Sequence, residues 1–168
     1  MEKTRDEILE GAKEAFFKAL LAGYAGDGSG VDVEKTSDGY TTNTWEEGEY
    51  RVVDRYCTTP LSDYSAGTTT IFFEDKAIWW MNYAGRYPAD AIPFLVEALK
   101  NAYEDRQFEG GRGRNGFMKV CDTESWTYQN IVKRSGFSDF SGKEMIHYAY
   151  CQNVIMVGYH EYSGISFI

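Results

Sequence analysis

Long apolar runs are absent from this sequence, and their absence excludes membrane-spanning helices. A helix needs about 20 consecutive apolar residues to cross a bilayer, and no part of the 168-residue sequence contains such a run. Residues 1–7 are mostly charged and lack the apolar stretch of a secretory signal. We therefore expect a soluble protein that resides in the cytoplasm and does not bind membranes.

Cysteine and positive charge are also scarce. Three cysteines, Cys57, Cys121 and Cys151, leave at least one thiol unpaired, which argues against a disulfide framework and favours a reducing compartment. The chain has 17 basic residues against 26 acidic ones, and its net charge is −9. Because such a surface repels phosphate groups, we expect no direct contact with nucleic acid. An acidic inhibitor that mimics nucleic acid on a basic partner is one hypothesis compatible with this charge.

Motifs of known chemistry are missing as well. The glycine-rich segment 23–30 follows a predicted helix instead of a strand and contains no Gly-Lys-Ser/Thr, so we do not expect it to bind phosphate. The sequence contains no Gly-x-Ser-x-Gly elbow, His-Glu-x-x-His helix or nucleotide fingerprint. The two histidines, His147 and His160, have no third ligand at a recognisable spacing. The sequence therefore predicts no metal ion and no cofactor.

Aromatic side chains, in contrast, are abundant and make up 16% of the residues. They concentrate in residues 68–86, where two β-branched and aromatic runs flank a short charged turn, the pattern of a β-hairpin. With Asp75 and Lys76 in the turn, Phe72 would face Trp79 across the two strands. Both faces of this hairpin are apolar, whereas a solvated antiparallel strand alternates apolar and polar residues. We therefore expect both faces to be covered.

Two helices are predicted, one before and one after the hairpin. Thr4 and Glu7 form a capping-box pattern, which opens a helix over Thr4–Leu21. A second helix is predicted over Asp90–Asp105, where a proline in the first turn is tolerated. Both segments carry apolar residues at helical spacing, so each should bury one face.

Strands are predicted for most of the remaining chain. Residues 49–56 and much of 117–168 have strand patterns, and residues 109–116, which contain Arg112 and Arg114, are predicted to be a connecting loop. The chain has no internal repeat, and its length suits one domain. The sequence thus predicts a single α+β domain over residues 1–168, with a curved antiparallel sheet and two helices packed on one face.

The candidate site combines two predicted strands. Alternation places Asp54 and Tyr56 on the more apolar face of segment 49–56, where a carboxylate needs a partner. The hairpin adds Trp80, Asn82, Tyr83 and Arg86. These side chains supply donors, acceptors and an aromatic wall, and they could orient a small polar ligand. The alternative is structural: Asp54 pairs with Arg86, and Asn82 completes the end of a strand.

One element of the hairpin carries a family resemblance. The element Trp80–Gly85 has the form Trp-x-Asn-Tyr-x-Gly, and it occurs together with residues 12–13, 24–26, 50–56 and 159–160. In these residues the chain resembles an uncharacterised bacterial domain family whose members occur alone or behind a helix-turn-helix region in transcriptional regulators. The resemblance covers most of residues 8–168 and implies the stand-alone form, because no helix-turn-helix segment is found here. It implies no known activity.

The chain departs from that family pattern in two places. Thr68 and Thr69 stand where the family carries acidic residues after the glycine that corresponds to Gly67, and the turn 74–76 lacks the usual glycine. The resemblance therefore brings no acidic function to residues 68–69.

Three functional hypotheses follow. The favoured one is a non-catalytic sensing or binding module that takes a small ligand or a protein partner at the site around Asp54 and Asn82. The second is an enzyme that uses Asp54 as a buried acid or base, with Tyr83 or Arg86 stabilising developing charge. The third is the acidic inhibitor, which requires a continuous negative surface.

Overall fold

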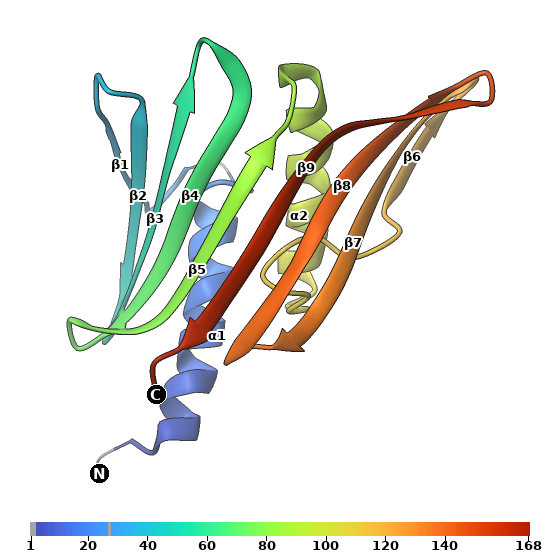
Figure 1. Cartoon of the computed structure of the whole chain (residues 1–168). Coiled ribbons are helices and arrows are strands. Elements are labelled where there is room, and N and C mark those ends of the chain that lie inside the picture. The colour runs from blue at the N-terminus through green and yellow to red at the C-terminus, as the bar shows by residue number, and fades with distance from the viewer. Residues whose placement is uncertain (1–2, 27) are drawn as a thin grey trace.

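A curved antiparallel sheet runs through the molecule, and two helices pack against one of its faces (Figure 1). The computed structural model describes residues 3–26 and 28–168; Asp27 of the predicted glycine-rich loop lies outside them. The helices are α1 (Arg5–Ala22) and α2 (Ile92–Glu104), and the short helix η1 (Ala89–Ala91) precedes α2. The strands are β1 (Asp32–Lys35), β2 (Tyr40–Glu47), β3 (Tyr50–Thr59), β4 (Ser62–Phe73), β5 (Lys76–Arg86), β6 (Met118–Cys121), β7 (Glu124–Gly136), β8 (Asp139–Tyr150) and β9 (Asn153–Ser166).

The sheet joins two meanders. Its strand order is β1-β2-β3-β4-β5-β9-β8-β7-β6, so the N-terminal and C-terminal strand sets meet where β5 pairs with β9. We call the face toward the helices the inner face and the opposite face the outer face. This arrangement confirms the predicted α+β domain with a curved antiparallel sheet. None of the helices in residues 3–26 and 28–168 combines the length and the apolar composition of a membrane-spanning segment.

Both helices form where the sequence predicts them. Thr4 caps α1: its hydroxyl accepts a hydrogen bond from the Glu7 amide, and the Glu7 carboxylate accepts one from the Thr4 amide. This reciprocal capping satisfies amide groups that have no partner inside the helix. The helix α2 begins two residues later than predicted, because residues 89–91 form η1 instead of the first α-turn.

The helices bury an aromatic layer against the inner face. Phe16 of α1 packs edge-on against Trp79 of β5 and Tyr103 of α2, with ring centroids 5.5 and 5.9 Å apart. Trp79 also stacks on Phe140 at 5.2 Å, which ties β8 to the same cluster. Fully burying a large apolar side chain contributes about 2–3 kcal/mol, so this layer is a main source of the fold's stability.

The β4–β5 hairpin differs in register from the prediction. The turn is formed by Glu74 and Asp75, which have positive φ angles of 46° and 61°, as a two-residue type I′ turn requires. A bulge then places Ile71 opposite Trp79. The predicted turn at Asp75 and Lys76 and the predicted pairing of Phe72 with Trp79 are therefore wrong, because neither the early turn nor the extra bulge residue shows in the apolar pattern.

The two faces of this hairpin are also not equally covered. On the inner face Ile71, Trp79 and Met81 are at most 1% exposed. On the outer face Phe72 and Trp80 are only half-buried, and the Arg51 guanidinium lies 3.9 Å from the Phe72 ring centroid. The expectation that both faces are fully covered is thus wrong for the outer one.

Candidate functional site

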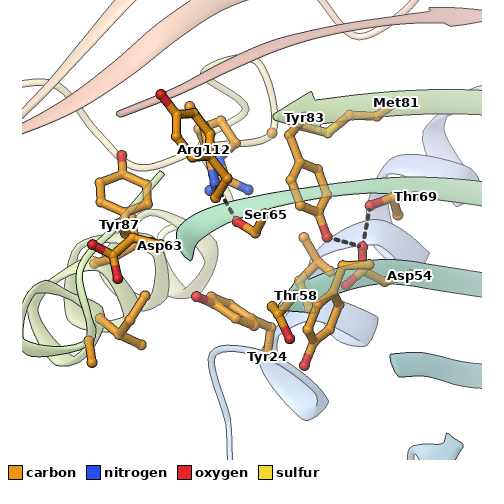
Figure 2. A pocket seen from close by; sticks show the side chains of 18 of the residues that line it. Tyr24, Asp54, Thr58, Asp63, Ser65, Thr69, Met81, Tyr83, Tyr87 and Arg112 are labelled. Carbon is orange, nitrogen blue, oxygen red and sulfur yellow. Dashed lines mark hydrogen bonds between the residues drawn. The ribbon is translucent and has the colours of Figure 1, made fainter. Parts of the chain in front are cut away.

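A cavity of about 330 Å³ lies between the inner face of the sheet and the helices (Figure 2). Its apolar wall comes from Leu20, Met81, Ile92 and Leu95, and its tyrosines are Tyr24, Tyr56, Tyr64, Tyr83, Tyr87 and Tyr103. The polar lining includes Asp54, Ser65, Thr69, Arg112 and His160. Exposed residues Asp63 and Tyr64 mark the opening to solvent.

The structure brings three of the six predicted site residues to this cavity. Asp54, Tyr56 and Tyr83 line it. Strand β5 alternates, so Tyr83 faces inward while Trp80, Asn82 and Arg86 face outward. These three were expected beside Asp54, and that placement is wrong.

Asn82 and Arg86 have other surroundings on the outer face. The Asn82 Oδ1 accepts hydrogen bonds from the amide and the hydroxyl of Ser163, at 3.2 and 2.8 Å. It lines a shallow groove together with Lys133 and Glu161. Arg86 is exposed, and the alternative pairing of Asp54 with Arg86 does not occur among the described residues, because Asp54 faces the other side of the sheet.

Asp54 is held by two hydroxyl groups. Its Oδ1 accepts hydrogen bonds from Thr69 Oγ1 at 2.8 Å and from Tyr83 OH at 3.0 Å, and Figure 2 shows both hydroxyls converging on it. The residue is 6% exposed. Burial raises the pKa of Asp54 above its ordinary value, although the Thr69 and Tyr83 hydrogen bonds lower it in part. The carboxyl group therefore holds its proton to higher pH than an exposed aspartate.

Glycines on intervening strands let these polar groups meet. Tyr83 on β5 reaches Asp54 on β3 across Gly67 of β4, where a Cβ atom would lie 2.5 Å from the tyrosine ring. Likewise, Tyr162 on β9 donates to Asn130 on β7 at 2.6 Å across Gly142 of β8. Because only glycine leaves this room, the inner face can link side chains that are two strands apart.

Ser65 and His160 also meet across a glycine on the strand between them. The Ser65 hydroxyl on β4 lies 3.0 Å from His160 Nε2 on β9, and Gly85 of β5 pairs with both residues. A Cβ atom on Gly85 would lie 2.9 Å from the His160 ring and 2.0 Å from the Tyr159 carbonyl oxygen. Gly85 is the last residue of the Trp-x-Asn-Tyr-x-Gly element, and this close approach is a physical reason why that position holds glycine.

Beyond His160, a buried ion pair completes the network. Glu144 of β8 is 0% exposed, and it accepts hydrogen bonds from the Arg112 guanidinium and the Tyr128 hydroxyl. Its Oε1 also lies 3.3 Å from His160 Nδ1. Burial raises the pKa of Glu144, but Arg112 and His160 lower it more, to about 2. Glu144 is therefore ionised and balances the charge of Arg112.

Burial also favours the neutral forms of His160, Tyr24 and Tyr83. Burial lowers the pKa of His160 below its ordinary value, and Glu144 opposes that effect only in part. Burial raises the pKa of Tyr24 to about 12 and also raises the pKa of Tyr83. His160, Tyr24 and Tyr83 thus lie in the cavity beside the Arg112–Glu144 ion pair with their neutral forms favoured.

Arg112 keeps one donor free of protein partners. Its Nε is buried and makes no hydrogen bond with any described residue, although the guanidinium pairs with Glu144 and lies 5.3 Å from the Tyr83 ring centroid. A buried donor without a partner costs about 1–3 kcal/mol. An acceptor group on a ligand in the cavity could remove that cost.

The loop that carries Arg112, which was predicted as a connecting loop, folds inward. Gly110 and Gly111 have positive φ angles of 66° and 70°, which turn the chain under the sheet. The Asn130 side chain then donates to the carbonyls of Glu109 and Gly113, both at 2.9 Å. The glycine density of the segment was the available signal, but it also fits an exposed loop.

Residues 54–164 match a protein family described as a domain of unknown function, DUF5680. The chain belongs to the DUF5680 family. A comparison with curated proteins found no match, and a comparison with solved structures found none either. This result agrees with the resemblance to an uncharacterised domain family and assigns no activity.

The DUF5680 region contains most of the cavity's polar wall. It begins at Asp54 and includes Ser65, Tyr83, Arg112 and His160, whereas α1 lies before it. Sequence reasoning missed Ser65, Arg112 and His160 as site residues. Each lacks a local motif: strand pairing brings Ser65 to His160, and the inward fold of the 109–116 loop brings Arg112 to them.

Proposed function

We propose that this DUF5680 protein binds a small, uncharged, amphipathic molecule in the cavity. A volume of about 330 Å³ falls within the range of ligand pockets, which are mostly apolar with a few placed polar groups. The walls supply Leu20, Met81 and Leu95 as apolar surface and several tyrosines as aromatic surface. Such a wall suits the apolar body of a ligand.

The polar groups favour a ligand without net charge. Arg112 is already balanced by Glu144, and burial favours the protonated form of Asp54. A ligand carbonyl or ether oxygen could accept from Arg112 Nε, and a ligand hydroxyl could bond to Asp54. The apolar, tyrosine-walled cavity with the buried Asp54 in its lining is the observation that carries this proposal.

A sensing role is supported by the family resemblance. That resemblance implies relatives that lie behind helix-turn-helix regions, where ligand binding would inform a regulator. A ligand that fills the cavity would link α1, α2 and the sheet, because all of them contribute to its wall. We therefore expect the ligand to stabilise the whole domain, as any molecule that binds only the folded state does.

The acidic-inhibitor hypothesis has less support. Lysines accompany acidic residues at separate places on the surface, for example in the pairs Lys119–Glu97 and Lys143–Glu161, at 2.9 and 3.3 Å. Pairs of this kind interrupt the continuous negative surface that such a mimic requires.

A thermal-shift screen tests the binding proposal. Neutral amphipathic compounds with a carbonyl group should include some that raise the Tm of the protein, and calorimetry should then give their Kd. Asp54→Asn should weaken a confirmed ligand at least about tenfold if the ligand bonds to the carboxyl group. Asn82→Ala, on the outer face, is the matched control and should leave Kd unchanged. Equal effects of the two substitutions, or no stabilising compound, would contradict the proposal.

A further inference from the structure

A serine, a histidine and a glutamate lie in one row across the inner face. Ser65 pairs with Gly85, Gly85 with His160, and His160 with Glu144, so the three side chains come from β4, β9 and β8 at facing positions. Ser65 and His160 line the cavity, whereas Glu144 lies wholly buried behind His160. The row therefore runs from the cavity into the core.

The distances suit transfer of the Ser65 proton to His160, with Glu144 orienting the imidazole. Ser65 Oγ is 3.0 Å from His160 Nε2, which is within hydrogen-bond reach. His160 Nδ1 is 3.3 Å from Glu144 Oε1 but makes no hydrogen bond with a described residue. Catalytic contacts of this length often tighten into hydrogen bonds when an active site is occupied. The ionised Glu144 favours the tautomer with hydrogen on Nδ1. Nε2 is then free to accept the Ser65 hydroxyl proton.

We propose that Ser65 is a nucleophile, with His160 as its general base and Glu144 as a positioning residue, and that they hydrolyse small neutral esters bound in the cavity. The proposal rests on the proposed function, because the substrate must first enter the same cavity. A nucleophile beside a base that a third group orients is the arrangement which activates serine on unrelated folds.

The reaction balances with water as the only co-reactant. Ser65 Oγ attacks the carbonyl carbon while its proton passes to His160 Nε2, and the carbonyl electron pair moves onto oxygen. The intermediate then breaks its bond to the alcohol oxygen, which takes the proton from Nε2. Water attacks the resulting acyl-serine and gives a proton to Nε2, and that proton returns to Ser65 as the carboxylic acid leaves.

Arg112 supplies a hydrogen-bond donor for the oxyanion that this reaction forms. It lines the same cavity, pairs with the Glu144 carboxylate that contacts His160, and keeps Nε without a protein partner. A fixed donor in a cavity of low polarity stabilises the negative charge that develops on the carbonyl oxygen. The neutral His160 and ionised Glu144 are also the protonation states that the first step requires.

The experiment combines covalent labelling with a rate measurement on the full chain. A fluorophosphonate probe should attach to Ser65, as located by peptide mass spectrometry, and p-nitrophenyl butyrate should be hydrolysed with saturation. Ser65→Ala should abolish labelling and lower kcat/KM at least about 100-fold. Ser163→Ala is the matched control, because Ser163 lies on the outer face and bonds to Asn82. Thermal unfolding of each variant verifies that it folds.

The pH dependence of kcat in Glu144 variants tests the positioning role of this residue. The groups around His160 are Ser65, Tyr83 and Tyr87 together with Glu144 and Arg112. Since the Glu144 carboxylate raises the pKa of His160, Glu144→Gln should lower kcat and move the acid limb of its pH profile to lower pH. A purely structural role would change Tm and leave that limb in place. If Glu144→Gln does not fold, Glu144→Asp should keep the wild-type limb at a reduced kcat.

Equal hydrolysis by wild type and Ser65→Ala, or an unlabelled Ser65 in the wild type, would overturn the catalytic inference. The Ser65→Ala variant keeps the rest of the cavity, so compounds from the thermal-shift screen should still raise its Tm. If they do while the wild type neither hydrolyses the ester nor takes up the probe, the chemistry fails and the binding proposal stands.

Discussion

Asp54 and Glu144 are both buried carboxylates on one face of one sheet, yet their pKa values move in opposite directions. Asp54, in the N-terminal strand set, has hydroxyl partners, and burial raises its pKa. Glu144, in the C-terminal set, faces Arg112 and His160, and its pKa falls to about 2 in spite of burial. A hydrogen-bonding hydroxyl thus offsets burial only in part, whereas a buried guanidinium reverses its effect.

The difference also separates two kinds of chemistry in the cavity. Asp54 lines the cavity directly and can hold a proton, so it suits a hydrogen bond to a ligand. Glu144 lies behind His160 and keeps its charge, so it acts on the cavity through its neighbours His160 and Arg112. Pairs of titratable groups with divergent pKa values are typical of functional sites, although structural ion pairs produce them too.

The largest expected effect comes from removing the cation that distinguishes the two carboxylates. Arg112→Met leaves Glu144 buried without its ion-pair partner, and breaking a buried pair from one side costs about 3–5 kcal/mol. Urea unfolding at pH 7 would measure the loss in the free energy of unfolding. Lys143→Met is the control, because its pair with Glu161 is more exposed and should be worth at most about 1 kcal/mol. Similar losses in both variants would show that Glu144 does not depend on Arg112.

A smaller difference in stability is expected between alanine variants of two glycines. Gly67 lies beside the Asp54 cluster (Asp54, Thr69 and Tyr83), and Gly85 lies beside the Glu144 cluster (Ser65, Arg112, Glu144 and His160). Alanine at Gly85 would place its Cβ 2.0 Å from the Tyr159 carbonyl oxygen, whereas at Gly67 the nearest atoms belong to the Tyr83 ring end, at 2.5 Å. A ring can shift more easily than backbone, so we expect Gly85→Ala to cost about 3 kcal/mol and Gly67→Ala about 1–2 kcal/mol.

Thermal and urea unfolding of the two glycine variants would test this order. Gly136→Ala is the control: its Cβ would meet no atom closer than 3.4 Å, and its stability should change by less than about 1 kcal/mol. The reverse order, with Gly67→Ala the more damaging, would mean that the Asp54 cluster is the more rigid of the two.

Much of the fold could be predicted because its signals are local. The capping box at Thr4 and Glu7 marks the start of α1 within one residue, and strand alternation places Asp54 correctly on the inner face. The site could be predicted only in part. The bulge in β5 shifts the register opposite Ile71 without a signal in the apolar pattern.

The contacts within the Glu144 cluster were not predicted, for a different reason. Its members are far apart in sequence: Arg112 and Glu144 are 32 residues apart, and Ser65 and His160 are 95 apart. No spacing rule connects them, and each residue alone has an ordinary surface or core interpretation. The contact of Ser65 with His160 depends on the β5–β9 pairing that joins the two meanders, and that of Arg112 with Glu144 depends on the inward fold of a loop. A single sequence reveals neither.

The smallest expected effect is the pH dependence that separates the two carboxylates. Glu144 has a lowered pKa in the folded state, so its contribution is present above pH 4.5 and is lost as the pH falls toward about 2. Asp54 has the opposite sign: its raised pKa means that the folded state binds more protons, so stability declines as the pH rises from 3.8 through the raised value.

Asp54→Asn should therefore remove only the second contribution. Both hydroxyls bond to Oδ1, and an asparagine retains that acceptor, so the variant should fold. Its free energy of unfolding relative to the wild type should increase from pH 4 to pH 7, by about 1.4 kcal/mol for each unit by which the pKa of Asp54 is raised. His160 titrates in both proteins and cancels in the difference. Urea unfolding at intervals of one pH unit would give the free energy of unfolding of both proteins as a function of pH. If the difference between variant and wild type does not vary with pH, burial does not raise the pKa of Asp54. The contrast with Glu144 would then not hold.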